Sequence, residues 1–126
     1  MIPSILIRYL TADHPIQSPK ARKLIENGPV FVATTVLLEA EWVLRGVYAY
    51  APDSVIEALT RFAGLPTVRL QDPKLAAKAL RWTRHGLEFA DALHLSTTEG
   101  CTGFVSFDRN LVRLAQGLHE IAVETP

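Results

Sequence analysis

The sequence has one cysteine, no excess of charge of either sign and no long hydrophobic run. Because Cys101 is the only cysteine among 126 residues, no disulfide can form within the chain, and nothing calls for an oxidising compartment. No apolar segment approaches the roughly 20 residues that cross a bilayer. The apolar amino terminus also lacks the basic region and the cleavage site of a signal peptide. We therefore expect a soluble, cytoplasmic protein.

Several kinds of chemistry are absent as well. With 13 basic and 13 acidic side chains, the chain has no bulk positive field to attract nucleic acid. There is no glycine-rich phosphate loop, and the four histidines lack the spacing of a zinc site.

With 48% hydrophobic and 21% charged residues, disorder is excluded as the overall state, and the length suits one compact domain.

Prolines, caps and glycines divide the chain into short segments. Ser18 before Pro19 and Asp72 before Pro73 have the order of an N-cap followed by a first-turn proline. Helices are predicted over 19–27, 35–50, 52–64, 73–85, 87–98 and 109–115, and apolar, β-branched runs predict strands over 5–9, 29–33, 67–70, 103–107 and 120–123. Strands separated by helices imply parallel crossovers, so we expect a single α/β domain over residues 1–126.

Three carboxylates lie in apolar surroundings. Glu39 falls at the edge of the apolar stripe of its helix, and Asp91 lies in a helix that is apolar nearly all round, with Glu88 one turn away. Asp108 follows a predicted strand directly. Carboxylates brought together in apolar surroundings repel one another, and a divalent cation removes that cost. Hard oxygen ligands select Mg²⁺ or Mn²⁺, so we expect a metal–carboxylate site.

Each acid also has a structural alternative. Asp108 is equally suited to be the N-cap of the following helix, Glu39 can be a half-exposed helix residue, and Asp91 can pair with a buried arginine. Glu41, by contrast, has Arg45 four residues on and is expected to form a solvated ion pair with it.

Four segments in order resemble the PIN domain, and in particular the VapC-type toxins of toxin–antitoxin pairs. They are ILIRYL with TADHP at 5–15, LLEAEWVLR at 37–45, FADALH at 89–94 and SFDR at 106–109. The resemblance implies a three-layer α/β/α sandwich with a central, mainly parallel sheet, and a metal-dependent ribonuclease. It implies that Glu39, Asp91 and Asp108 are the catalytic, metal-binding acids, with Ser106 as a supporting hydroxyl.

The sequence departs from this family at its first strand. Where PIN domains of this type have Asp-Thr-Asn, the chain has Ile2, Pro3 and Ser4, so the first-strand Asp is missing. Ser4 can retain a polar contact of the missing Asn, and Glu88 is the one nearby acid that could compensate. Asp13 lies too far along the chain to substitute. We therefore expect weakened or absent nuclease activity.

Basic and apolar surface residues suggest partners. Lys74, Lys78 and Arg81 share a helix face that either follows a phosphate backbone or is simply solvated. Arg109 and Arg113 beside Asp108 are better placed to hold an RNA phosphate. Leu38 and Trp42 lie on a flank that either packs within the domain or meets a partner, for which the resemblance implies a VapB-like antitoxin or the second copy in a homodimer.

Three functional classes follow. The first is an antitoxin-neutralised endoribonuclease, and the second is a catalytically degenerate relative that acts through antitoxin binding and dimerisation. The third, a phosphate-accepting receiver, is disfavoured because it needs an acid pair after the first strand, where this chain has none.

Overall fold

The computed structural model describes residues 1–118 and 122–126, and in these it has seven helices and four strands. The chain divides into two compact units, Met1–Pro73 and Lys74–Pro126. Among the described residues, no helix is long and apolar enough to cross a membrane.

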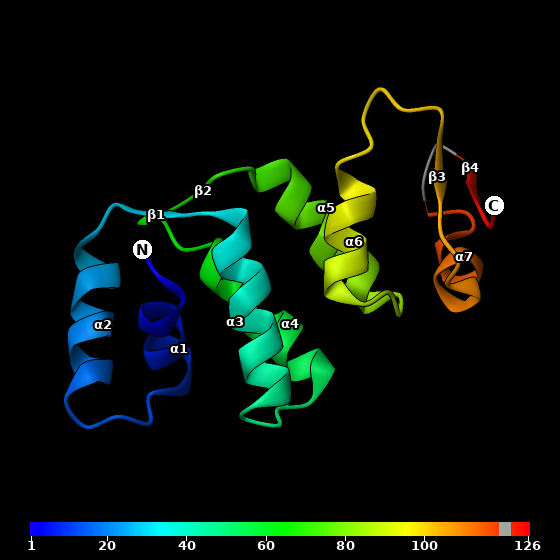
Figure 1. The fold of residues 1–126 in the computed structure, drawn as a ribbon. Coiled ribbons are helices and arrows are strands. Elements are labelled where there is room, and N and C mark those ends of the chain that lie inside the picture. The colour runs from blue at the N-terminus through cyan, green and yellow to red at the C-terminus, as the bar shows by residue number, and fades with distance from the viewer. Residues whose placement is uncertain (119–121) are drawn as a thin grey trace. The chain divides into compact units, whose positions relative to one another are not determined.

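The first unit consists of helices around a short parallel sheet (Figure 1). Its elements are α1 (Pro3–Thr11), α2 (Gln17–Asn27), β1 (Val30–Val32), α3 (Thr34–Gly46), α4 (Pro52–Ala63) and β2 (Val68–Leu70). Strands β1 and β2 run parallel, with Val30 opposite Val68 and Val32 opposite Leu70. Helix α1 lies beside both α2 and α3. The largest side chains withdrawn completely from solvent in this unit include Leu6, Ile25, Leu37, Leu59 and Phe62.

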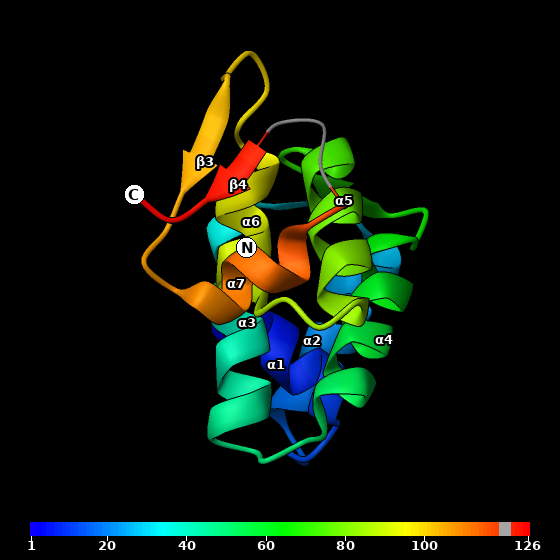
Figure 2. The same cartoon turned by 90° about the vertical axis from the view of Figure 1, so that its right-hand side faces the viewer.

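The second unit contains α5 (Pro73–Arg84), α6 (Phe89–Ser96), β3 (Gly103–Val105), α7 (Arg109–Ala115) and β4 (Ala122–Glu124). The boundary between the units falls just after Pro73, the first residue of α5. Strands β3 and β4 are parallel neighbours, as Figure 2 shows. The backbone N–H of Ser106 donates to the carbonyl of Glu124 at 3.1 Å, which continues the pairing one residue beyond β3. Of the predicted strand 120–123, residues 120 and 121 lie outside the described residues.

The prediction of an α/β fold with parallel strand pairs is confirmed, and most helix boundaries lie within a few residues of those expected. Pro52 and Pro73 each begin a helix, and Gly64 follows the end of α4. These signals are reliable because proline lacks the N–H that the first turn leaves unpaired. In the described residues the strands form two sheets of two strands each.

The predicted strand over 5–9 is wrong, because these residues form the middle of helix α1. Ile2 is extended at the N-cap position and Pro3 occupies the first turn, so the chain enters a helix there. Leu6 and Ile7 are buried while Ser4 is exposed, which is the pattern of one buried helix face. A five-residue apolar run cannot be assigned to strand or helix by periodicity alone.

Ser18 is not the N-cap of the second helix. Helix α2 begins at Gln17, and Ser18 is buried inside its first turn. The N-cap residue is Ile16, which makes no capping hydrogen bond with its side chain. His14 lies just before the helix, and its Nδ1 accepts hydrogen bonds from the backbone N–H groups of Ile16 at 3.2 Å and Gln17 at 2.9 Å, so it satisfies one donor of the first turn.

Candidate functional site

Asp108 lies where β3 gives way to α7. Its Oδ1 accepts hydrogen bonds from the backbone N–H groups of Asn110 at 3.0 Å and Leu111 at 3.1 Å, so it is the N-cap of α7. Its own N–H donates to the hydroxyl of Ser106 at 3.0 Å, which places that supporting hydroxyl beside it. The capping alternative for Asp108 is therefore confirmed. Because only Oδ1 is used, Oδ2 remains available to a ligand.

Asp91 lies in the first turn of α6 and is half-buried. Burial is the largest effect that raises the pKa of its carboxyl, and the negative charges of Glu88 and Asp108 raise the pKa further. His94 acts in the opposite direction. Among the described residues no hydrogen bond reaches the Asp91 carboxylate. In the second unit, Asp91 is therefore an acid whose charge is opposed by the charges of Glu88 and Asp108.

The two acids of α3 are arranged differently from the prediction. Glu39 is exposed, so the argument from an apolar environment does not apply to it. Glu41, expected to be solvated, is buried with a side chain only 5% exposed. Its Oε1 accepts from Nε of Arg45 at 2.8 Å, so the ion pair is confirmed but its solvated character is wrong. The helix turns Glu41 inward and Glu39 outward because residues two apart face different sides.

The remaining predicted site residues lie on the surface. Lys74, Lys78 and Arg81 of α5 are exposed, as are Arg109 and Arg113 of α7, where Arg113 donates to the side chain of Asn110. Ser4, in the first turn of α1, is exposed too. On α3, Trp42 is 60% exposed and Leu38 half-buried, so the alternative in which the tryptophan packs inside the domain is wrong.

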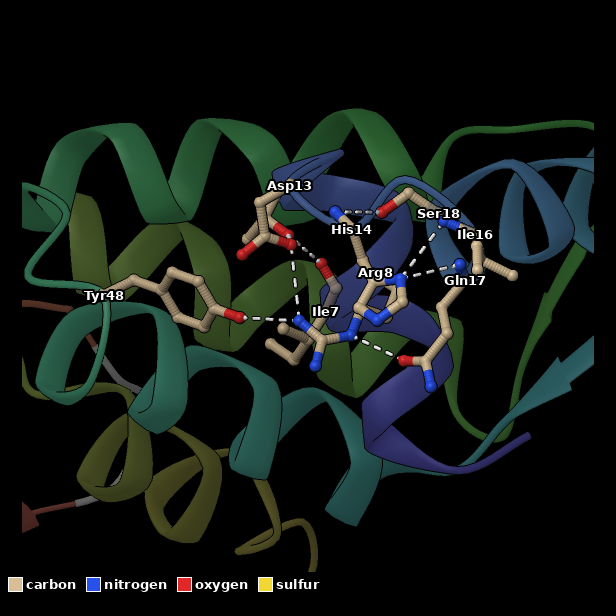
Figure 3. Close-up of polar contacts among 9 residues, drawn as sticks. Ile7, Arg8, Asp13, His14, Ile16, Gln17, Ser18 and Tyr48 are labelled. Atoms are coloured by element: carbon tan, nitrogen blue, oxygen red, sulfur yellow. Dashed lines mark hydrogen bonds and ion pairs between the residues drawn. The ribbon is translucent and has the colours of Figure 1, made fainter.

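A polar cluster in the first unit was not predicted (Figure 3). Arg8 donates from Nη1 to Asp13 at 3.3 Å and to the hydroxyl of Tyr48 at 3.2 Å, and from Nε to Gln17 at 2.9 Å. The hydroxyl of Thr11 donates to the same Asp13 oxygen at 2.6 Å, and this bond is the main reason that the pKa of Asp13 lies below its ordinary value. The cluster joins α1, the start of α2 and the end of α3, and it has no local sequence signature.

One family model matches this chain. The PIN domain model matches residues 4–117, which is most of the chain. The chain belongs to the PIN domain family. PIN domains are nucleases, generally dependent on divalent metal ions and often part of toxin–antitoxin systems. The comparisons with curated proteins and with solved structures found no match.

The acids of this PIN domain can be tested against the metal that the family implies. Asp91 and Asp108 supply hard carboxylate oxygens, the donors that Mg²⁺ and Mn²⁺ prefer. Their mutual repulsion, seen in the raised pKa of Asp91, is what a bound cation would relieve. Within residues 1–118 and 122–126, however, no three acidic, histidine or cysteine side chains are grouped closely enough to hold an ion. Two acids of the second unit, Asp91 and Asp108, therefore have oxygen donors of the kind that a divalent cation prefers, but no third ligand is grouped with them among the described residues.

Proposed function

We propose that this chain is a VapC-like toxin, a metal-dependent endoribonuclease that cleaves RNA phosphodiesters and is neutralised by a cognate VapB-like antitoxin. The observation that carries the proposal is the acidic group of the second unit, where Asp91 is half-buried beside Asp108 without a hydrogen-bonding partner among the described residues. An ionised carboxylate in that position costs stability, which a function in metal binding explains.

The proposal assigns Asp91 and Asp108 as metal ligands and Glu88 as a supporting charge, and it keeps Glu39 as the acid that the family resemblance assigns by sequence position alone. A divalent cation held there would activate the attacking water and neutralise charge on the phosphate. The N–H groups of Asn110 and Leu111 fix the orientation of the Asp108 carboxylate, and Ser106 holds the backbone at its position. Arg109 and Arg113, exposed on the helix that Asp108 caps, are suited to bind the RNA phosphates.

The test is Mn²⁺-dependent cleavage of a structured RNA by the parent chain and by two variants, Asp91→Asn and Ile2→Asp. We expect weak cleavage by the parent, none by Asp91→Asn and stronger cleavage by Ile2→Asp, which restores an acid at the family's first-strand position. Glu99→Gln is the matched control, because Glu99 is an exposed acid of the same unit that has no part in the proposed site. Cleavage that survives Asp91→Asn would contradict the assignment.

A second candidate function is a catalytically degenerate PIN domain that acts through antitoxin binding and dimerisation. It is favoured by Ile2 at the position of the family's first-strand Asp and by the absence of a three-ligand group among the described residues. Cleavage that appears only in Ile2→Asp would support it, since the remaining ligands would then be intact in a disabled enzyme.

Both candidates require a partner surface, and we assign it to Trp42 with Leu38. A tryptophan that is 60% exposed is the kind of residue that anchors protein interfaces. We expect Trp42→Gln to weaken homodimerisation or antitoxin binding, measured by light scattering after size-exclusion chromatography, whereas Ile16→Gln, a change at another exposed apolar residue of the same unit, leaves them unchanged.

A further inference from the structure

A hollow lies in the first unit, between α1, α2 and α4. It has a volume of about 610 Å³, within the ~300–1,000 Å³ range of small-molecule sites. Its apolar wall includes Tyr9 and Leu10 of α1, Phe62 of α4 and Leu65. The half-buried Tyr9 ring packs against the buried ring of Phe62 at 6.0 Å between centroids, so Tyr9 is the aromatic side chain that the hollow offers to a ligand.

The polar groups around this hollow are hydrogen-bond donors or cations. Arg22 contributes from α2 and Arg61 from α4, and no acidic side chain is among the residues that line the space. Each arginine is held by a glutamate four residues away on its own helix, Arg22 through Nε to Glu26 and Arg61 through Nη2 to Glu57. These contacts leave both Nη groups of Arg22, and Nε and Nη1 of Arg61, for another acceptor.

Two further donors come from the loop into α2. His14 lines the hollow, and because its Nδ1 accepts two backbone N–H bonds, the proton of the neutral ring is on Nε2. Ser18 also lines the hollow and is only 7% exposed. Its Oγ accepts from the N–H of His14, and among the described residues its hydroxyl proton has no acceptor.

An apolar aromatic wall together with two arginines and two neutral donors matches one chemical class. We propose that this hollow binds a nucleoside monophosphate group, with the base against Tyr9 and the phosphate at Arg22 and Arg61. Charge-assisted bonds to a phosphate are strong, and aromatic rings accept any base by stacking. His14 and Ser18 supply donors for sugar or base oxygens and nitrogens. None of the residues that line this hollow is one of the proposed nuclease acids.

The proposal is tested by calorimetric titration of the full chain with AMP in the presence of EDTA, which removes any metal-dependent binding. Adenosine and inorganic phosphate are titrated alongside. The variants are Arg61→Gln, which removes one charge at the mouth, and Ala58→Leu, which fills the hollow without changing charge. Lys23→Gln is the control, since Lys23 is an exposed cation of α2 that does not line this hollow.

We expect AMP to bind more tightly than either adenosine or phosphate. Arg61→Gln and Ala58→Leu should each weaken AMP by about tenfold, the effect of losing one charged hydrogen bond or comparable contact, and Lys23→Gln by less than about twofold. The proposal is overturned if AMP fails to bind at about 1 mM, if phosphate alone binds as well, or if Lys23→Gln weakens binding as much as Arg61→Gln.

The two sources of such a group are a free nucleotide and the 5′ end of an RNA chain. Titration with a short oligoribonucleotide with and without a 5′-phosphate distinguishes them. Binding that requires the 5′-phosphate supports an RNA end as the ligand, and binding of AMP alone supports a free nucleotide. Equal binding of the two oligonucleotides, with no binding of AMP, contradicts the proposal.

Discussion

Asp108 carries two functions that a pair of substitutions separates. Its Oδ1 caps α7 by accepting from the N–H groups of Asn110 and Leu111, and its charge contributes to the proposed metal site beside Asp91. Replacing an N-cap residue by alanine costs about 1 kcal/mol, within a range of roughly 0.5–2. In a chain of this length that loss lowers the melting temperature by roughly 3–6 °C. Asn is as good a cap as Asp, so Asp108→Asn should change stability by only a few tenths of a kcal/mol.

The response to Mn²⁺ distinguishes the second function. A ligand at ten times its dissociation constant stabilises the folded state by about 1.4 kcal/mol, which is again a shift of several degrees. We expect this shift in the parent chain and in Glu99→Gln. Asp108→Asn should keep the metal-free melting temperature but lose most of the shift, because the amide removes the charge and retains the cap. Asp108→Ala should lose both.

Two results would refute this reasoning. If Asp108→Asn retains the full Mn²⁺ shift and the parent's RNA cleavage, then Asp108 is an N-cap and nothing more. If Asp108→Ala has the melting temperature of the parent, then the two hydrogen bonds at 3.0 and 3.1 Å contribute no stability and the capping assignment fails.

Four further predictions concern single side chains. Burial and the neighbouring charges raise the pKa of Asp91, so above that pKa the ionised carboxylate destabilises the metal-free fold. Asp91→Asn should therefore raise the free energy of unfolding at neutral pH by about 1 kcal/mol or less, measured by urea titration. The pKa of Asp13 is lowered in the folded state, so its stabilising contribution is present above the ordinary value of 3.8 and is lost as pH falls through the folded-state pKa. The difference in unfolding free energy between the parent and Asp13→Asn should therefore be constant from pH 5 to 7 and shrink below pH 4. Glu41→Ala breaks a buried pair and should cost roughly 1–3 kcal/mol in thermal denaturation, less than a fully buried pair because its arginine partner is 34% exposed. Ile2→Asp should stabilise α1 by about 0.5–1 kcal/mol with or without metal, because Ile2 is the N-cap residue and has no capping side chain.

The sequence predicted the elements whose signals are local. Pro52 and Pro73 begin helices where they were expected to, and the cap by Asp108 was one of the two alternatives that its position after a strand left open. The strand prediction over 5–9 was wrong because a short apolar run is compatible with either a strand or a helix. The proline at position 3, in the first turn of α1, is the feature that favours the helix.

Features that depend on contacts between distant residues could not be predicted. The hydrogen bond from Arg8 to the Tyr48 hydroxyl joins residues 40 positions apart, and the hydrogen bonds to His14 lie in a loop that no periodic pattern describes. The burial of Glu41 rather than Glu39 depends on which face of α3 packs inward, and the apolar stripe of that helix was too broad to choose between them.

Asp91 and Asp108, the two proposed metal ligands of the second unit, differ in what their presence says about function. Asp108 contributes to folding through its cap whether or not a metal is bound, so its presence is compatible with an active or a degenerate nuclease. Asp91 is half-buried, it is repelled by Glu88 and Asp108, and no described residue donates a hydrogen bond to it, so only its place in the first turn of α6 and the nearby His94 favour its charge. A chain that had no use for a cation would gain stability from a neutral residue there. Asp91 is therefore the residue that favours the nuclease over the degenerate alternative, and its substitution is the most informative single change in this protein.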